Sequence, residues 1–261
     1  MAKLTHLVSH LLCLLRRLKW LKSYLHHTET SWKIPTPLLV KLPPDDLMRC
    51  DGLLFDKDGT LFDFQATWSG WFLNVLAQLS QGDLTKQKKL AEAIDFDLSE
   101  QAFFAHSVAI AGTNQDLVEA LIGELEGISE QELEDFLTQE SLKAPVMEIT
   151  PLVAFFDLLQ LNGLKLGVMT NDAEAGARAH LDAVGVAQKL EFIAGYDSGF
   201  GAKPSAEPLL AFCASVGILP SRVAMVGDST HDLIAGKAAG MHCICVLSGL
   251  ADQRTLQAYA D

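Results

Sequence analysis

The sequence predicts an α/β protein with a Rossmann-like core, a parallel sheet carrying helices on both faces, plus an inserted all-helical cap domain. Three observations support this class. Short apolar runs alternate with amphipathic segments in the last hundred or so residues, which is typical of a parallel sheet. A long helical stretch separates the first apolar run from the others. Polar residues follow several of the apolar runs.

The core elements are expected in a regular order along the chain. The first strand is the run "GLLF" after Cys50, and a later helix stops at Asn162-Gly163, a favoured helix C-terminus. Strand and helix then alternate to the end of the sheet. The further strands are expected at 164–169, 191–196, 222–227 and 242–247, with helices at 149–163, 175–184, 206–217 and 232–240.

The helical stretch is too long for an ordinary crossover, since it covers roughly 80 residues. We therefore expect an inserted module. The predicted division is an N-terminal extension at 1–47, a Rossmann-like core at 48–66 and 147–261, and a helical cap at 67–146.

The N-terminal extension is basic and amphipathic, with leucines on one helical stripe of residues 1–27. Three interpretations stay open. It could be a membrane-surface helix or targeting segment, it could dock on the protein or a partner, or it could precede a true start at Met48. No stretch reaches the roughly 18 to 20 apolar residues of a membrane span.

The charge and the cysteine content argue against two classes of protein, nucleic-acid binders and disulfide-stabilised scaffolds. The formal net charge is −13, which argues against a nucleic-acid partner. The five cysteines form an odd, scattered set, which favours a reducing, cytoplasmic setting over a disulfide scaffold. Cys243 and Cys245 share one face of an expected buried strand, and we interpret them as structural.

Polar clusters follow three of the expected strands, and a loop adds a lysine. In open α/β sheets, ligands bind outside the carboxyl ends of the strands, so these residues are expected to meet at one edge. The residues are Asp56, Asp58 and Thr60; Thr170, Asn171 and Asp172; Asp228, Ser229 and Asp232; and Lys203.

The stretch "DKDG" also begins many calcium-binding EF-hand loops, but the rest of that pattern is missing. Such a loop needs glycine at its sixth position and glutamate at its twelfth, where this chain has Leu61 and Thr67. Phosphoryl transfer fits better. Several carboxylates could hold Mg²⁺, one could attack phosphorus, and a second could move the proton of the leaving oxygen.

Four motifs, in order, resemble those of the haloacid dehalogenase superfamily of phosphatases. They are "DKDGT" at 56–60, "VMTND" at 168–172, "GAKP" at 201–204 and "GDSTHD" at 227–232. The helical segment between the first two resembles the family's helical cap. The resemblance covers residues from about 48 to 250, leaves 1–47 outside, and is strongest to the members similar to phosphoglycolate phosphatase.

The resemblance implies a role for each matched residue. Asp56 would be the nucleophile and a Mg²⁺ ligand, and Asp58 would be the general acid/base, with its backbone carbonyl on the metal. Asp228 and Asp232 would complete the metal site.

For the phosphoryl group, the resemblance implies four partners. Thr170 would donate a hydrogen bond, Asn171 and Gly59 would lie nearby, and Lys203 would neutralise charge on the phosphoryl oxygens and on Asp56.

The aspartate at position 58 favours an oxygen leaving group, since relatives that cleave other bonds resemble "DxY" or "DxA" there. We therefore predict a Mg²⁺-dependent phosphatase that hydrolyses a small phosphorylated metabolite through an aspartyl-phosphate. A phosphomutase of the same superfamily and a catalytically silent binding protein with this fold remain alternatives.

The cap is expected to set the choice of substrate. The segment 105–115 interrupts the helical pattern, and it offers Ser107, Thr113 and Asn114 as substrate-binding candidates but no Lys or Arg. A doubly anionic substrate such as phosphoglycolate gains no counter-charge from it. Trp68 and Trp71 open the cap, and we expect them to pack in its core.

Lys57 and several histidines are expected to have structural or surface positions and no catalytic role. Side chains alternate along a strand, so Lys57 is expected to point away from Asp56 and Asp58, to salt-bridge behind the site or reach solvent. Four histidines beyond the N-terminal extension show no ligand-like spacing, and we expect surface positions or local hydrogen bonds. They are His106, His180, His231 and His242.

Overall fold

The structure is a computed structural model, which describes residues 50–261. The expectations for 1–47, including membrane contact through 1–27 and a start at Met48, lie outside the described residues. No helix in the described part is both long and apolar enough to cross a bilayer.

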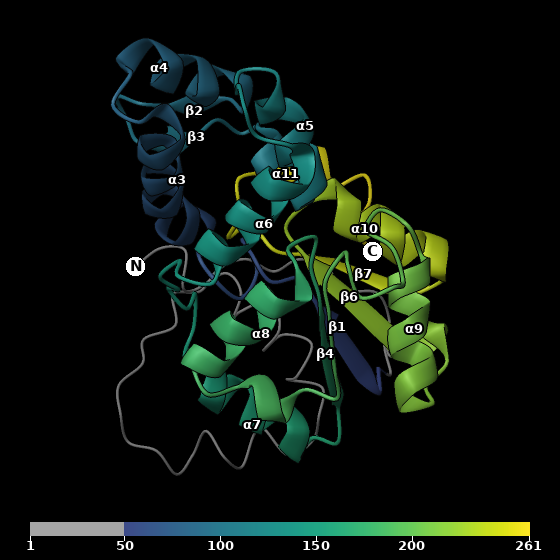
Figure 1. Ribbon diagram of the computed structural model, residues 1–261. Coiled ribbons are helices and arrows are strands. Elements are labelled where there is room, and N and C mark those ends of the chain that lie inside the picture. Colours follow the sequence, from purple (N-terminus) through teal and green to yellow (C-terminus); the bar gives the residue numbers. More distant parts are fainter. Residues whose placement is uncertain (1–49) are drawn as a thin grey trace, which may run out of the picture.

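A five-stranded parallel sheet forms the centre of the larger lobe (Figure 1). Its strand order is β5-β4-β1-β6-β7, so the first strand lies in the middle and pairs along its length with β4 and β6. This confirms the predicted parallel sheet. The strands are β1 (Gly52–Phe55), β4 (Lys165–Met169), β5 (Phe192–Ala194), β6 (Val223–Gly227) and β7 (His242–Cys245).

Helices cover both faces of the sheet, and alternation along β1 shows why. Leu53 and Phe55 belong to an apolar cluster with α7 and α8, whereas Leu54 faces the cluster of α9 and α10. The helices are α7 (Leu152–Leu161), α8 (Glu174–Ala183), α9 (Glu207–Val216), α10 (Thr230–Ala239) and α11 (Gln253–Leu256), with short 3₁₀ turns η2 (Ala187–Lys189) and η3 (Pro220–Arg222).

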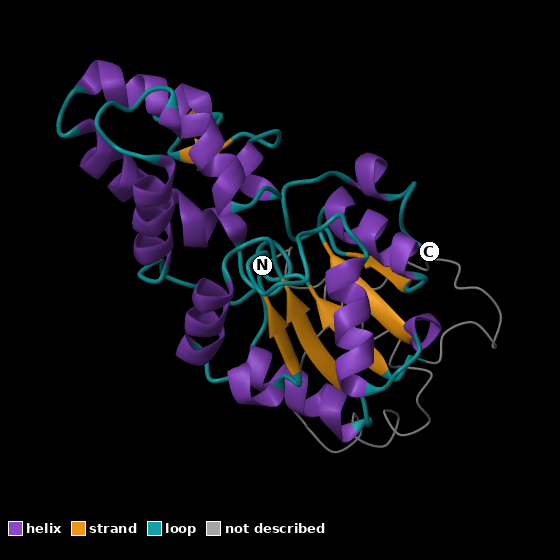
Figure 2. Cartoon of the chain, turned by 45° about the vertical axis from the view of Figure 1, so that its right-hand side comes forward, coloured by secondary structure: helices purple, strands orange, loops and turns teal. Residues whose placement is uncertain are grey.

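The cap forms a second lobe with its own apolar core, drawn from residues between 64 and 144 (Figure 2). Side-chain caps start its helices: Asp63, Asp83, Thr113 and Ser129 each accept a hydrogen bond from the first turn. The elements are α3 (Phe64–Ser80), α4 (Leu84–Ala93), η1 (Val108–Ile110), α5 (Asn114–Ile122) and α6 (Glu130–Ser141).

The cap is not all-helical, which corrects the sequence-based expectation. β2 (Phe96–Asp97) and β3 (Ala102–Phe103) form an antiparallel pair. Each strand has only two residues, which is too short for an alternating sequence pattern to predict it. The rings of Phe96 and Phe103 pack across the pair with their centroids 4.8 Å apart.

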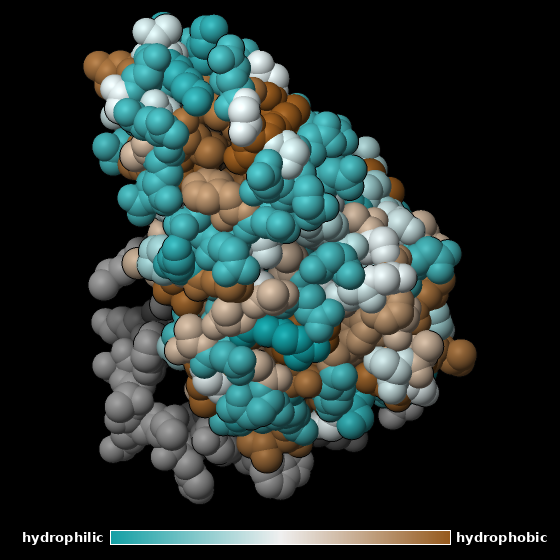
Figure 3. Space-filling view, in the orientation of Figure 1, coloured by the Kyte–Doolittle hydropathy of each residue, from teal (hydrophilic) through white to brown (hydrophobic). Residues whose placement is uncertain are grey.

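Two adjacent linkers join the cap to the core. Ile149 N donates to Leu61 O and Asp63 N donates to Met147 O, both at 2.9 Å. The two chain segments therefore enter and leave the cap side by side, close to the carboxyl end of β1. On the face drawn in Figure 3, hydrophilic side chains cover much of the cap lobe and apolar ones show between them.

Candidate active site

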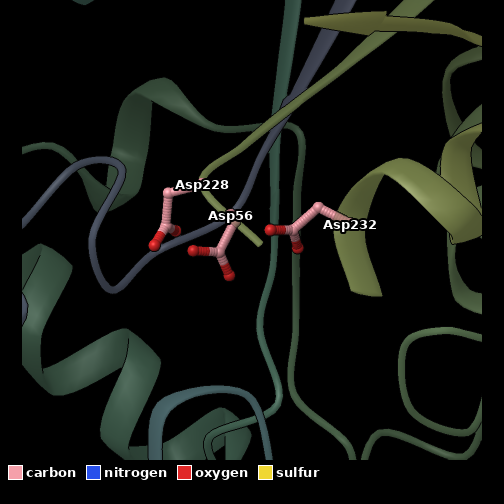
Figure 4. Close-up of side chains that lie close together, drawn as sticks. All are labelled: Asp56, Asp228 and Asp232. Carbon is pink, nitrogen blue, oxygen red and sulfur yellow. The ribbon is translucent and has the colours of Figure 1, made fainter. Parts of the chain in front are cut away.

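Three buried carboxylates meet at the carboxyl edge of the sheet. Asp56 directly follows β1, Asp228 directly follows β6, and Asp232 lies in the first turn of α10. Oxygens of the three lie within 4.8 Å of one another, and Figure 4 shows the carboxylates turned toward a common space. The sheet thus brings together residues that lie up to 176 positions apart in the sequence (232 − 56).

Lys203 is the cation inside this group. Its Nζ lies 2.5 Å from Asp56 Oδ1 and 2.6 Å from Asp232 Oδ1, and the side chain is buried. Burial lowers the pKa of Lys203, but the carboxylates of Asp232 and Asp56 outweigh it and raise the pKa above its usual range. Lys203 is therefore charged at neutral pH.

One lysine does not balance three buried acids. Burial raises the pKa of Asp56 to about 7, with Lys203 opposing the shift and Asp232 adding to it. Burial, together with the charges of Asp56 and Asp232, also raises the pKa of Asp228 well above its ordinary value. A divalent cation would offset the negative charge that these carboxylates carry once they ionise.

Two glycines allow the backbone to approach Asp228 closely. A Cβ on Gly59 would lie 2.4 Å from Asp228 Oδ2, and one on Gly249 would lie 1.7 Å from the same atom. Gly59 also has a φ of +81°, which side chains rarely adopt. Thr60 Oγ1 donates to Asp228 Oδ1 at 3.1 Å and fixes the carboxylate.

The donor set fits a hard cation such as Mg²⁺, because it consists of closely spaced carboxylate oxygens. Among the described residues, Asp56, Asp228 and Asp232 are the acids grouped closely enough to share an ion. The carboxylate of Asp58 does not belong to this group of three; its Oδ2 lies 2.7 Å from Lys57 Nζ.

Thr170 and Asn171 follow β4 and lie in the same site. Thr170 Oγ1 accepts from the backbone N–H of Asp172 at 3.1 Å. The Asn171 side chain pairs with the Lys203 backbone in both directions at 2.9 Å, and its Nδ2 also donates to Ala111 O of the cap at 2.8 Å. The sequence analysis places Asn171 near the phosphoryl group but does not predict these side-chain contacts.

The expectation that Lys57 points away from Asp58 or reaches solvent is wrong, whereas an ion pair of Lys57 does form. The side chain is fully buried, and its Nζ meets Asp58 Oδ2 at 2.7 Å, Asp172 Oδ2 at 3.1 Å and His180 Nδ1 at 3.1 Å. Strand alternation ends at Phe55, because Leu61 N and Phe62 N both donate to Lys57 O and the chain turns there. A lysine flanked by two acids was the available signal.

His180 is likewise neither at the surface nor locally bonded. It is buried on α8, and its Nε2 lies 3.1 Å from the carbonyl oxygen of Ser141 at the end of α6. Burial, and next the charge of Lys57, lowers the pKa of His180, so the ring is neutral at neutral pH. His106 instead lies exposed near Asp95, and His242 lies half-buried near Asp261.

A cavity of about 60 Å³ lies between the sheet edge and the cap. Of the substrate-binding candidates in the cap, Thr113 and Asn114 line this cavity, but Ser107 does not, because its Oγ donates to Ile94 O at 2.5 Å inside the cap. Sequence reasoning missed His231 as a lining residue, although it falls inside the fourth motif.

The cap supplies only uncharged residues to the cavity wall within the described part of the chain. Thr113 is occupied by a capping box with Asp116, and Asn114 Nδ2 donates to Thr138. Trp68 and Trp71 pack in the cap core as expected and also line the cavity. The cap residues in the wall are Phe64, Trp68, Trp71, Ala109, Ile110, Ala111, Gly112, Thr113, Asn114 and Leu117.

A Rossmann-like sheet whose strand-end carboxylates surround a buried lysine, covered by a helical cap, defines a class of hydrolase. The family model for haloacid dehalogenase-like hydrolases matches residues 53–246. The chain belongs to this family, which confirms the resemblance expected from its motifs.

Several known proteins are similar to this chain. It is 29% identical over 206 residues to the probable phosphatase IndB of Dickeya dadantii, covering 79% of this chain and 85% of that protein. It is 42% identical over 101 residues to a phosphoglycolate phosphatase of Chromobacterium violaceum, a match that spans 39% of this chain and 46% of the relative.

Solved structures support the fold. A haloacid dehalogenase-like hydrolase from Bacteroides fragilis superposes with a TM-score of 0.61 at 20% identity, covering 81% of this chain and 94% of that one.

Proposed function

We propose that the protein is a Mg²⁺-dependent phosphatase that hydrolyses a small phosphate monoester through an aspartyl-phosphate on Asp56. The observation that carries the proposal is the position of Asp56. It lies among the carboxylates of Asp228 and Asp232, with Lys203 Nζ 2.5 Å away and Asp58 on the wall of the same cavity.

In the first half-reaction a carboxylate oxygen of Asp56 attacks phosphorus and forms a P–O bond. The bond to the leaving alcohol breaks, its electron pair stays on the alcohol oxygen, and that oxygen takes the proton of Asp58. Lys203 forms an ion pair with Asp56 and Thr170 lines the same cavity, which supports our proposal that both hold the phosphoryl oxygens.

In the second half-reaction water attacks phosphorus while ionised Asp58 takes its proton. The bond between phosphorus and Asp56 then breaks, which restores the carboxylate and releases inorganic phosphate. A bound Mg²⁺ would neutralise the carboxylates and the transferring group. Asp56, Asp228 and Asp232 would hold it, and the backbone carbonyl of Asp58 is the further ligand that we propose.

For the substrate, we propose a small ester of the phosphoglycolate type or a less charged analogue. Relatives named phosphoglycolate phosphatases favour the former. The uncharged cap wall favours the latter, because a second buried carboxylate would meet Asp58 and Asp172 without a cap cation among the described residues. Comparing phosphoglycolate with 2-hydroxyethyl phosphate at matched concentration separates the two.

Turnover of p-nitrophenyl phosphate tests the reaction class. The wild-type protein should release nitrophenolate with Mg²⁺ and not after chelation, and Asp56→Asn should remove the activity. Asp182→Asn, an exposed aspartate on α8, is the matched control and should keep it. No turnover above background in either the wild type or Asp56→Asn would favour a silent binding protein instead.

A phosphomutase is separated by its products. A phosphatase releases inorganic phosphate in step with the alcohol, whereas a mutase returns the phosphoryl group to a sugar hydroxyl. Measuring phosphate and alcohol together decides between them.

A further inference from the structure

Lys57 lies at the centre of a buried polar cluster next to the reacting carboxylates. Its ammonium contacts Asp58 from its own loop, Asp172 from the end of β4 and His180 from α8, at 2.7 to 3.1 Å. The indole of Trp68, from cap helix α3, lies above it with its centroid 5.0 Å from Nζ. Burying a lysine ammonium away from water costs free energy, and these contacts offset that cost. The side chain of Lys57 is therefore held in one defined position.

The two oxygens of Asp58 have different surroundings. Oδ2 is held by Lys57, whereas Oδ1 is buried and has no hydrogen-bond partner among the described residues. Asp58 also lines the cavity. An ion pair on one oxygen limits rotation of the carboxylate, which leaves the other oxygen to exchange a proton.

The partners of Lys57 are themselves fixed. Asp172 Oδ1 accepts from the backbone N–H of Ala173 at 2.7 Å. Lysine can only donate, so His180 Nδ1 is the acceptor, its proton lies on Nε2, and Nε2 donates to Ser141 O of the cap. Trp68 contacts the same histidine, with ring centroids 5.6 Å apart. The cluster therefore touches both cap helices that adjoin the linkers, α3 and α6.

We propose that Lys57 is a positioning residue that sets the orientation of Asp58 for proton transfer, and that His180 ties this orientation to the seated cap. The proposal rests on the proposed phosphatase function. A lysine that serves only to stabilise the fold would have no reason to affect the proton-transfer steps more than the others.

Pre-steady-state hydrolysis of p-nitrophenyl phosphate separates these steps. Nitrophenolate leaves without an acid, so formation of the aspartyl-phosphate needs little from Asp58, while its hydrolysis needs Asp58 as base. Lys57→Met should therefore give a burst of about one nitrophenolate per enzyme at close to the wild-type rate. The following steady state should be about 10- to 100-fold slower than wild type.

His180→Phe replaces the imidazole with another aromatic ring and removes both hydrogen bonds. His180→Phe should also slow the steady state more than the burst, but by a smaller factor. It replaces Lys57→Met in the experiment if Lys57→Met does not fold. Lys165→Met is the matched control, because Lys165 forms a half-exposed ion pair with Glu191 and should behave as wild type.

The outcomes are distinguishable. A Lys57→Met enzyme whose burst and steady-state rates fall in proportion would overturn the positioning role, and a His180→Phe enzyme with the wild-type ratio of the two rates would overturn the tie to the cap. Wild-type protein inactive with Mg²⁺ on this ester would overturn the proposed function itself.

Discussion

The metal-free protein should lose stability as pH rises, because the site holds carboxyl groups that burial keeps protonated. The pKa of Asp56 is raised from 3.8 to about 7, and the pKa of Asp228 is raised as well. The folded state therefore binds protons that the unfolded chain has released between about pH 4 and pH 7. Since stability falls with pH wherever the folded state binds more protons, the loss occurs in this window.

The magnitude follows from the shift of Asp56. A raised pKa of about three units at roughly 1.4 kcal/mol per unit gives a loss on the order of 4 kcal/mol from about pH 4 to above pH 7. Asp228 acts in the same direction. A loss of this size is a large fraction of the stability of an ordinary domain.

Urea unfolding at a series of pH values, with a chelator present, measures this loss. Asp56→Asn removes one titrating group, so its stability should depend less on pH and exceed that of wild type at about pH 8. Saturating Mg²⁺ should also flatten the wild-type profile above about pH 6. A metal-free free energy of unfolding that stays level or rises between about pH 5 and pH 8 would refute the reasoning.

Three further predictions concern the same site. Mg²⁺ at about 100 times its Kd should add about 2.7 kcal/mol to the free energy of unfolding, and Asp228→Asn should abolish the gain in a thermal-shift titration. Lys203→Met should lower kcat for p-nitrophenyl phosphate by about 100-fold or more, and a smaller effect would question its contact with Asp56. Gly249→Ala should weaken Mg²⁺ binding about tenfold by calorimetry, since the added Cβ would lie 1.7 Å from Asp228 Oδ2. Gly70→Ala should bind Mg²⁺ normally, because a Cβ added there would have nothing within 4 Å.

The central part of the site could be predicted from the sequence because it follows from parallel strands. Once "GLLF" and "RVAMVG" are recognised as neighbouring strands, Asp56 and Asp228 must end at the same edge. Asp232 then follows from its place in the first turn of the helix that begins there. These arguments need only local pattern and the geometry of a sheet.

The errors arose where local pattern stops applying. Strand alternation predicts that Lys57 points away from Asp58, but the backbone turns after Phe55 and the Lys57 side chain contacts Asp58 and Asp172. The polar side chain of Ser107 suggests a substrate-binding residue, but its hydroxyl donates a hydrogen bond to the carbonyl of Ile94, thirteen positions earlier. No periodicity reports such long-range polar contacts.

Lys57 and His180 show the same limit most clearly. They are 123 residues apart and meet only because β1 and α8 lie against each other beneath the cap. The sequence could identify the reacting groups, while the residues that orient them became visible only in the folded structure.

Trapping the phosphorylated enzyme tests the central claim most directly. Acid quenching during turnover, borohydride reduction and peptide mass spectrometry would convert an aspartyl-phosphate into homoserine at its own position. We predict homoserine at position 56 in the wild-type protein, dependent on substrate and Mg²⁺, and none in Asp56→Asn. Turnover without a reduced residue at position 56, or reduction at another aspartate, would contradict it.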